Sequence, residues 1–216
     1  MTRRTSGGRE RSIRLAIDIG GTFTDLVALD ETTGELILEK TLTTPSDFAR
    51  GVTDAIESAG FDATRVEQFV HGTTVVINAL TERRGAKVAL VTTDGFRDVL
   101  EIQRANRTDM YNLLYAKPEP FVPRRFRFEI PERVDHRGEI LAPLDEEAVE
   151  KVAGECDRLG IEAIAVCYLN AYANPEHEAR TLEILQERLH SVAITASHEI
   201  TQQWREYERT NTTAMN

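Results

Sequence analysis

The stretch Asp18-Ile19-Gly20-Gly21-Thr22-Phe23-Thr24-Asp25 carries residue types that bind phosphate. It lies between two apolar runs, Ile13–Ile17 and Leu26–Leu29, which predicts a glycine turn between two strands. Glycine lets backbone N–H groups approach an anion closely, and a neighbouring carboxylate can hold Mg²⁺ directly or through water. Because no helix follows the glycines, the Walker P-loop and the dinucleotide-binding fingerprint are excluded. The alternative is an ordinary hairpin turn with glycines for geometry alone.

Two further polar stretches follow predicted strands. His71-Gly72-Thr73-Thr74 joins the strand Val66–Val70 to a helix start, where free N–H groups and the helix dipole favour anions. The alternative is that Thr73 only caps the helix and His71 is a satisfied core histidine.

The second stretch, Thr92–Asp98, follows the buried strand Lys87–Val91, at the end of a sheet where ligands collect. In it, Arg97 either clamps a carbonyl or phosphate group with two hydrogen bonds or pairs with Asp98. The residues leave both interpretations open.

These stretches resemble two known groups of proteins. Asp-x-Gly-Gly-Thr between strands is similar to the first phosphate motif of the actin-like ATPase fold, shared by sugar kinases, actin and heat-shock ATPases. The wider set resembles the N-terminal region of the hydantoinase A/5-oxoprolinase family, which includes N-methylhydantoinase A and acetone carboxylase beta-like proteins. The matching residues are Asp18–Asp25, His71–Thr74 with Asn78 and Ala79, Leu90–Asp98, Pro123-Arg124, Glu132–Val134, Asn174–Glu178 and Glu206–Thr210. Family members are much longer than this chain.

The resemblance implies ATP and Mg²⁺ as cofactors, and it implies roles for individual residues. Catalytic roles fall to Asp18, His71 and Thr73. The metal is expected at Asp18 and Asp25, although Asp25 could equally satisfy local backbone N–H groups. Nucleotide contacts are expected from Gly20, Gly21, Thr22, Thr24, Gly72 and Thr74. Substrate contacts are expected from Arg97 and Asn78.

The resemblance also implies an ATP-dependent enzyme that activates a cyclic amide (a hydantoin, 5-oxoproline or another lactam) or a ketone carbonyl by phosphorylation, for hydrolysis or carboxylation. Phosphorylation gives a poor electrophile a good leaving group. The expected partners are the carbonyl substrate, a second ATPase lobe and a hydantoinase B-type subunit or domain. We expect the full-length protein to be a cyclic-amide hydrolase and this chain alone to be inactive. The alternatives are a sugar or carboxylate kinase of the same superfamily and a non-catalytic isolated lobe.

Composition narrows the class of protein. A chain of 216 residues with 41% hydrophobic content is long enough for one large or two small cores. A net charge of −10 argues against nucleic-acid binding. Cys156 and Cys167 are too few for a disulfide framework, and no stretch approaches the ~20 apolar residues of a membrane span. These features predict a cytoplasmic protein that binds no membrane.

The order of predicted elements indicates an α/β fold of the ribonuclease-H-like (actin-like ATPase) type, with three antiparallel strands followed by alternating strands and helices. The strands are Ile13–Ile19, Asp25–Asp30 and Glu35–Leu42. Helices are expected to open at Pro45-Ser46, Thr73, Asp145 and Asn174-Pro175, the last with Ala179, Leu182, Leu185 and Leu189 buried.

The predicted domain boundaries follow from this order. Residues 1–12 are expected to be a flexible tail, because no apolar segment follows their arginines. Residues 13–203 are expected to form the hydantoinase/oxoprolinase N-terminal domain. It contains an irregular insertion at about 104–131, near substrate or a partner. Residues 204–216 are expected to start a helix that leads to the second lobe.

Overall fold

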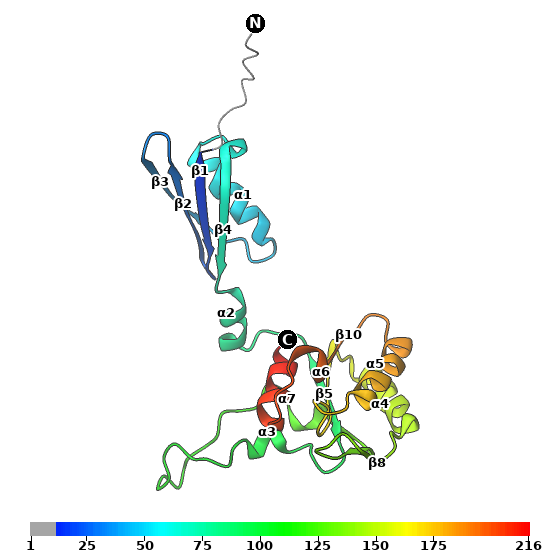
Figure 1. The fold of residues 1–216 in the computed structure, drawn as a ribbon. Helices are drawn as coiled ribbons and strands as arrows, with labels where there is room; N and C mark the ends of the chain where they lie inside the picture. The colour runs from blue at the N-terminus through cyan, green and yellow to red at the C-terminus, as the bar shows by residue number, and fades with distance from the viewer. Residues whose placement is uncertain (1–11) are drawn as a thin grey trace, which may run out of the picture. The chain divides into compact units, whose positions relative to one another are not determined.

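The computed structural model describes residues 12–216, and the chain divides into two compact units at Arg84/Gly85 (Figure 1). Each unit has its own cluster of buried apolar side chains, so the chain has two cores. Every strand pairs within its own unit. This division was not among the predicted boundaries, which placed residues 13–203 in one domain. The expected tail, residues 1–12, lies outside the described residues except for Ser12.

Unit 1 is built on a four-stranded sheet in the order β3-β2-β1-β4. The strands are β1 (Ile13–Ile19), β2 (Phe23–Asp30), β3 (Glu35–Leu42) and β4 (Val66–Thr73). The first three are antiparallel, and β4 runs parallel to β1. The predicted α/β fold and the three leading antiparallel strands are confirmed. β4 is three residues longer than predicted and includes His71-Gly72-Thr73.

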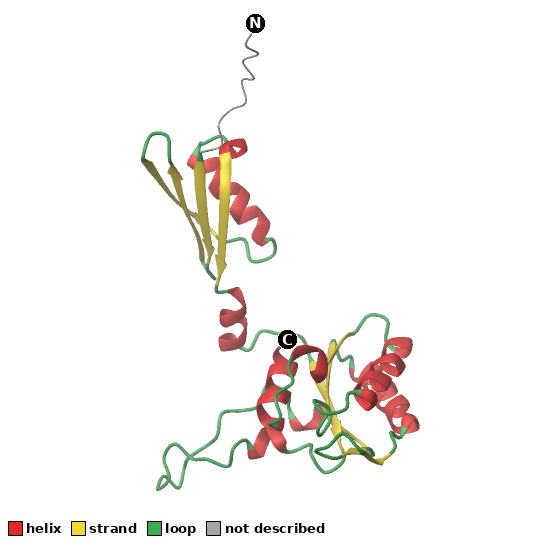
Figure 2. Cartoon of the chain, viewed as in Figure 1, coloured by secondary structure: helices red, strands yellow, loops and turns green. Residues whose placement is uncertain are grey.

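Strict alternation along β1 separates the two faces of this sheet. Ile13, Leu15, Ile17 and Ile19 are buried, whereas the residues between them are exposed. The buried face packs on α1 (Phe48–Ala59), which Figure 2 shows lying along the sheet. Asp18 therefore lies on the face opposite α1, since successive side chains of a strand point to opposite sides.

The helices of unit 1 begin slightly later than predicted. Asp47, rather than Pro45 or Ser46, caps α1 by accepting from Arg50 N, and Gly60 ends the helix in the left-handed conformation. The short η1 (Ala63–Arg65) precedes β4, and α2 (Val75–Glu82) follows it. Thr74, not Thr73, occupies the N-cap position of α2.

Unit 2 contains a parallel sheet in the order β10-β9-β5-β6. Its strands are β5 (Val88–Thr93), β6 (Arg127–Ile130), β9 (Ala163–Cys167) and β10 (Ala193–Ala196), with a separate pair β7 (Arg133–Val134) and β8 (Ile140–Ala142). Its helices are α3 (Val99–Ile102), η2 (Arg124–Phe126), α4 (Glu146–Leu159), α5 (Glu176–Arg188), α6 (Ser197–Ile200) and α7 (Glu206–Met215). Asp145 caps α4 as predicted.

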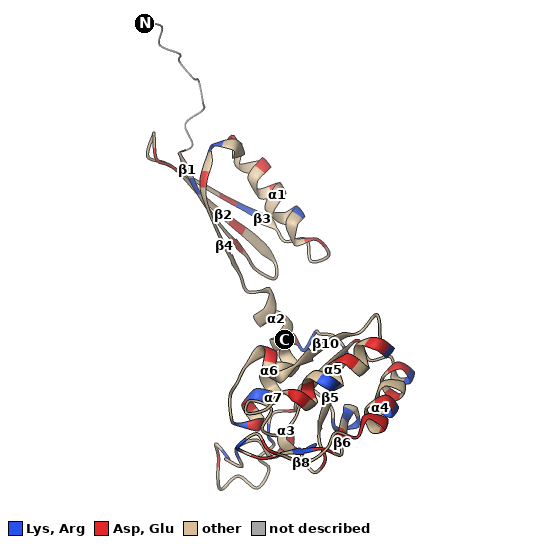
Figure 3. Ribbon diagram, turned by 45° about the vertical axis from the view of Figure 1, so that its right-hand side comes forward, with Lys and Arg blue, Asp and Glu red and all other residues tan. Residues whose placement is uncertain are grey.

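Helices lie on both faces of the parallel sheet, as connections between parallel strands require. The helices α4 and α5 pack together, and α7 packs on β9 and α3. The helices α4 and α5 carry many charged residues (Figure 3), and Arg180 of α5 forms an ion pair with Glu146 of α4 at 2.8 Å. No helix within residues 12–216 is long and apolar enough to cross a membrane.

The predicted irregular insertion, residues 104–131, is irregular only in part. From Arg104 to Pro123 the chain forms no helix or strand, but β6 completes the parallel sheet beside β5. The inclusion of residues 124–131 in the insertion was therefore wrong. The strand β6 was missed because its four residues are too few to show a pattern of alternation.

Candidate functional site

One end of the unit 1 sheet gathers the glycine turn, the end of β4 and the start of α2. We call this the glycine-turn site and define it by Asp18, Gly20, Gly21, Thr22, Gly72, Thr73, Thr74 and Asn78. Because β1 and β4 are parallel, their carboxyl ends meet at the same edge: Asp18 pairs with Gly72, and Ile19 pairs with Thr73. Most of the residues that the sequence assigned to phosphate and metal binding are thus brought together.

The glycine turn is tight and has little room for side chains. Gly20 N donates to the Phe23 carbonyl oxygen at 2.9 Å and closes the turn. A Cβ on Gly20 would lie 3.0 Å from that same oxygen, and a Cβ on Gly21 would lie 3.0 Å from Asn78 Nδ2. Both distances are closer than ordinary contacts. Glycine therefore keeps the backbone of the turn open to an approaching anion.

Asp18 is an exposed carboxylate without a hydrogen bond or ion pair to any residue within 12–216. Its Oδ1 atom lies 3.4 Å from the position of a Cβ on Gly72, so Gly72 leaves the space beside the carboxylate free. An uncompensated carboxylate next to open backbone is the type of ligand that Mg²⁺ takes together with phosphate oxygens and waters.

Asp25 stands opposite Asp18 in the pairing of β1 with β2. Unlike Asp18, it has a partner, because Lys40 Nζ lies 2.5 Å from its Oδ1. Lys40 also lies over the Phe23 ring, 4.9 Å from the ring centroid. The ammonium group competes with a metal for this carboxylate. The geometry therefore favours Asp18 over Asp25 as the metal residue, and a metal role for Asp25 stays a prediction.

The start of α2 completes the site. The Thr73 hydroxyl donates to the Ile19 carbonyl oxygen at 3.1 Å and accepts from Val75 N at 3.2 Å. Asn78 Nδ2 reaches Thr74 Oγ1 at 3.4 Å, one turn into the helix. The first N–H groups of α2 and the helix dipole provide a positive end beside the glycine turn. Thr73 thereby ties β4 to β1, while Thr74 and Asn78 face the turn.

Two predicted residues are separated from this arrangement. His71 precedes Gly72 on β4 and so points to the opposite face of the sheet from Asp18, where it stacks on Phe69 with ring centroids 6.3 Å apart. Thr24 is fully buried, and its hydroxyl lies 3.1 Å from Thr43 Oγ1. The structure thus gives no support to a phosphate contact by Thr24, and it places His71 away from Asp18.

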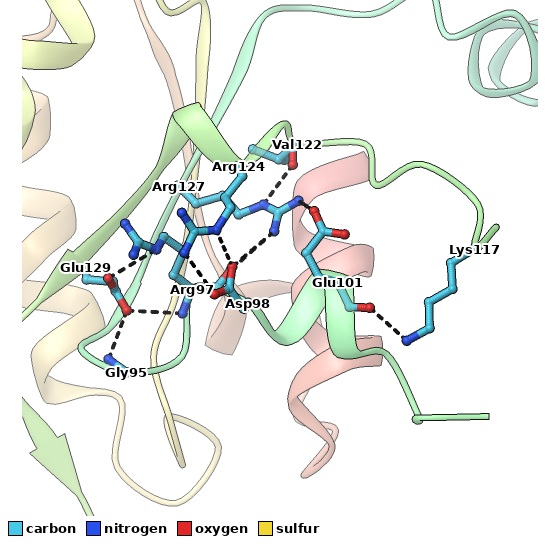
Figure 4. A network of polar contacts seen from close by, with 9 residues as sticks. All are labelled: Gly95, Arg97, Asp98, Glu101, Lys117, Val122, Arg124, Arg127 and Glu129. Carbon is cyan, nitrogen blue, oxygen red and sulfur yellow. Dashed lines mark hydrogen bonds and ion pairs between the residues drawn. The ribbon is translucent and has the colours of Figure 1, made fainter. Parts of the chain in front are cut away.

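Arg97 belongs to unit 2, where Figure 4 shows it in a network of ion pairs. Its Nε lies 3.3 Å from Glu129 Oε2, and the N–H groups of Gly95 and Arg97 donate to Glu129 Oε1 at 2.9 and 3.4 Å. The alternative prediction, a pair between Arg97 and Asp98, was wrong. Asp98 instead accepts hydrogen bonds from Arg124 Nε and Nη2 at 2.8 and 3.0 Å. The hydrogen bonding to Arg124 lowers the pKa of Asp98.

A second arginine completes the same network. Arg127 is buried, donates to the Val122 carbonyl oxygen at 2.8 Å and reaches Glu101 at 3.0 Å. These bonds join β6 to α3 and to the end of the long loop (Figure 4). The network therefore has a structural part in unit 2, and a substrate contact by Arg97 stays a prediction.

The residues of the glycine-turn site fit ATP with a bound magnesium ion. The turn exposes Gly21 and Thr22, and Asp18 offers a carboxylate without a partner among residues 12–216. The residues that would hold the phosphates are Gly20, Gly21, Thr22, Gly72 and Thr74, with Asp18 toward the metal.

Comparison with known proteins identifies the family of this chain. The family model of the hydantoinase/oxoprolinase N-terminal region matches residues 14–189, most of the chain. The chain belongs to this family. The match includes every residue of the glycine-turn site.

Members of the hydantoinase/oxoprolinase family with known structures share the fold. The acetone carboxylase chain in its nucleotide-free structure, described as performing ATP-dependent acetone carboxylation, superposes with a TM-score of 0.83 at 26% identity, over 95% of this chain and 32% of that one. The ATP-dependent caprolactamase of Pseudomonas jessenii superposes with a TM-score of 0.79 at 35% identity, over 94% of this chain and 31% of that one. An uncharacterised protein of Methanocaldococcus jannaschii is 40% identical over 94% of this chain and 30% of its own length. The chain thus spans about a third of these relatives and matches the N-terminal region of ATP-dependent enzymes.

One part of the site was not found from the sequence. Thr43 lies just after β3 and contacts the glycine turn through its backbone and its hydroxyl, although it is 23 residues from Gly20 in the chain. Thr43 lies beside Thr44 in an ordinary polar connection, which carries no pattern to distinguish it. Only the pairing of β2 with β3 brings it to the turn.

Proposed function

We propose that this chain supplies the first phosphate-binding element of an ATP-dependent enzyme that activates a carbonyl compound, with a cyclic amide as the substrate and hydrolysis as the outcome. The observation that carries the proposal is the meeting of an unpaired carboxylate, Asp18, with the open glycine turn and the start of α2 at one sheet edge. The two solved relatives are described as ATP-dependent, one acting on caprolactam by its name and one on acetone.

In this proposal each group of the site has a defined part. The N–H groups of the glycine turn and of the first turn of α2 bind phosphate oxygens, and Asp18 orients Mg²⁺. Thr74 and Asn78 fix the position of the turn relative to the helix. ATP, when bound, supplies a phosphoryl group that converts a carbonyl oxygen into a leaving group. In such reactions the protein acts mainly by positioning and by stabilising charge.

Partners and location form part of the proposal. Because the chain spans about a third of its relatives, a second ATPase lobe and a hydantoinase B-type subunit or domain are proposed to provide the remaining contacts. The P. jessenii relative is itself named as a subunit, caprolactamase subunit alpha. A cytoplasmic location agrees with the two cysteines, Cys156 and Cys167, which are buried free thiols.

The test is substrate-dependent release of ADP by the full-length protein with Mg²⁺. A panel of 5-oxoproline, hydantoin and caprolactam is compared with acetone plus bicarbonate and with simple sugars. Ring-opened product and ADP in equal amounts are expected with one cyclic amide. A stable phosphorylated sugar would instead identify a kinase. Carboxylated ketone would identify a carboxylase, and no ADP release under any condition would reject ATP-dependent activation.

A further inference from the structure

Thr43 contacts the glycine turn through both its backbone and its side chain. Its N–H donates to the Thr22 carbonyl oxygen at 2.9 Å, and its hydroxyl donates to the Gly20 carbonyl oxygen at 3.0 Å. The residue is buried, with 9% of its surface exposed. Thr43 therefore holds the two carbonyl groups that flank Gly21 in the turn.

The single hydrogen of each hydroxyl group decides which threonine is the donor next to the turn. Thr43 Oγ1 also lies 3.1 Å from Thr24 Oγ1. A hydroxyl has a single hydrogen, and Thr43 donates its hydrogen to the Gly20 oxygen. In the pair of threonines Thr24 must then be the donor. The result is a buried chain of hydrogen bonds from Thr24 to Thr43 to Gly20, in which each bond polarises the next.

By holding two carbonyl groups of the turn, Thr43 also fixes the direction of the N–H groups that follow them. The peptide bonds of residues 12–216 are all trans. In a planar trans peptide the C=O of one residue and the N–H of the next point in opposite directions. Fixing the Gly20 and Thr22 carbonyls toward Thr43 therefore points the N–H groups of Gly21 and Phe23 away from it. Gly21 and Thr22, next to these N–H groups in the chain, are exposed.

Gly51 of α1 leaves the space that the Thr24 hydroxyl needs in this chain of hydrogen bonds. A Cβ on Gly51 would lie 3.2 Å from Thr24 Oγ1, which is closer than an ordinary contact. Gly51 thus leaves room for the hydroxyl that orients Thr43. A substitution there disturbs Thr24 without removing any atom of Thr43 or of the turn.

We propose that Thr43 is a positioning residue that aims the backbone N–H groups of the glycine turn at the nucleotide phosphates, with Thr24 orienting its hydroxyl. The phosphate part of this inference rests on the proposed function. Thr43 itself contacts no ligand. It acts through Gly20 and Thr22. Thr24, which the sequence assigned to a phosphate contact, instead acts from within the core by orienting the Thr43 hydroxyl.

The experiment uses four variants of the full-length protein. Thr43→Val removes the hydroxyl at nearly constant volume, and Thr43→Ser restores it. Gly51→Ala displaces Thr24. Thr41→Val is the matched control, because it removes the hydroxyl of a β3 residue two positions away, whose one hydrogen bond among residues 12–216 goes to the Gly51 carbonyl oxygen, at 3.4 Å. The first measurement, made without nucleotide, is amide hydrogen exchange and the amide chemical shifts of Gly21 and Phe23 by NMR. The second is KM and kcat for ATP·Mg²⁺.

We expect Thr43→Val and Gly51→Ala to shift the Gly21 and Phe23 amides. We also expect Thr43→Val to raise KM for ATP by about tenfold to a hundredfold, the scale of a misplaced contact group. Thr43→Ser and Thr41→Val are expected to stay within about threefold of the wild type, well below that scale. Unchanged Gly21 and Phe23 amides in Thr43→Val overturn the inference, as does a lower melting temperature with an unchanged KM. If Thr43→Val does not fold, the amides in Gly51→Ala decide in the same way. If the wild type does not use ATP, the proposed function fails, while the amides still show whether Thr43 positions the turn.

Discussion

Asn78 reaches back from the first turns of α2 to the glycine turn, where its Nδ2 atom lies 3.0 Å from the place a Cβ on Gly21 would take. The same amide group lies 3.4 Å from Thr74 Oγ1. The side chain of Asn78 thus fills the space that the missing side chain of Gly21 leaves. The glycine turn and the start of α2 are in close contact at this point, so a substitution at Gly21 must displace Asn78.

The first prediction concerns this fit. Gly21→Ala should weaken ATP binding, because the new methyl group displaces the Asn78 amide. Asn78→Ala should relieve that conflict in part. A double-mutant cycle on the dissociation constant of ATP·Mg²⁺ should therefore show a coupling of about 0.5–3 kcal/mol, the range for residues in contact. Strictly additive effects would show that Asn78 and Gly21 act independently.

The second prediction separates the two aspartates of the hairpin. Asp18→Asn should reduce ATP turnover by about a hundredfold to a thousandfold, which is ~2.7–4 kcal/mol of lost transition-state stabilisation. Its melting temperature should hardly change, because Asp18 has no partner among residues 12–216. Asp25→Asn is the matched control, because Asp25 lies opposite Asp18 in the strand pairing. It should reduce ATP turnover far less, since Lys40 already neutralises the Asp25 carboxylate. Near-normal turnover in Asp18→Asn would reject the metal assignment.

The first strand of the site could be predicted from the sequence because it contains the apolar run Ile13–Ile17. Within Ile13–Ile19 the structure buries every second residue, namely Ile13, Leu15, Ile17 and Ile19. Asp18 and the glycines could be assigned for the same reason, since they follow directly on this strand. The face of His71 could not be predicted, because β4 has no such alternation and its register against β1 depends on pairing across 54 residues.

Unit 2 shows a different limit of prediction. The apolar spacing of α5 correctly indicated Leu185 and Leu189 as buried, whereas Ala179 and Leu182, also expected to be buried, are half-buried. The same helix also buries His177, Glu178 and Thr181. Glu178 is fully buried and accepts hydrogen bonds from Tyr168 N at 2.8 Å and from Ser197 Oγ at 2.6 Å. Charged residues are seldom fully buried unless paired. Their partners come from other elements, which a hydrophobic pattern does not reveal.

The third prediction concerns the long loop of unit 2. Tyr111, Leu113 and Leu114 are 91%, 95% and 92% exposed, and no strand or helix protects their amides. We expect rapid amide exchange over residues 104–121 and slow exchange over β6, whose residues pair with β5. Hydrogen exchange with mass spectrometry measures both segments in one experiment. Protection over residues 104–121 equal to that of β5 would show a packed segment instead.

The fourth prediction is a pH dependence that arises from His198. The hydrogen bond from its Nδ1 to Glu178 Oε2, at 2.8 Å, raises the pKa of His198 above its usual value. Since the folded protein then holds this proton more tightly than the unfolded chain, the stabilisation is fully present below about pH 6.5. It is lost as the pH rises through the raised pKa. For one proton the slope is at most about 1.4 kcal/mol per pH unit.

Denaturant unfolding of the wild type and of His198→Gln between pH 5.5 and 8.5 measures this effect. The wild type should lose stability with rising pH across this range relative to the variant. His190→Gln, at an exposed histidine near the end of α5, is the matched control and should keep the slope of the wild type. Parallel curves for the wild type and His198→Gln would show that the Glu178–His198 pair is not the source.

The last prediction is that this chain alone binds ATP weakly and turns none over. The glycine-turn site offers contacts for phosphates from one side only, whereas sites for small molecules usually cover most of the ligand surface. Without further contacts to the adenosine and to the far side of the phosphates, we expect a dissociation constant no better than about 1 mM, or ~4 kcal/mol of binding free energy. Titration calorimetry of residues 1–216 with ATP·Mg²⁺ tests this, with Asp18→Asn as the control for binding at the site. Micromolar affinity, or substrate-dependent release of ADP by this chain, would show that the phosphate site is complete within it.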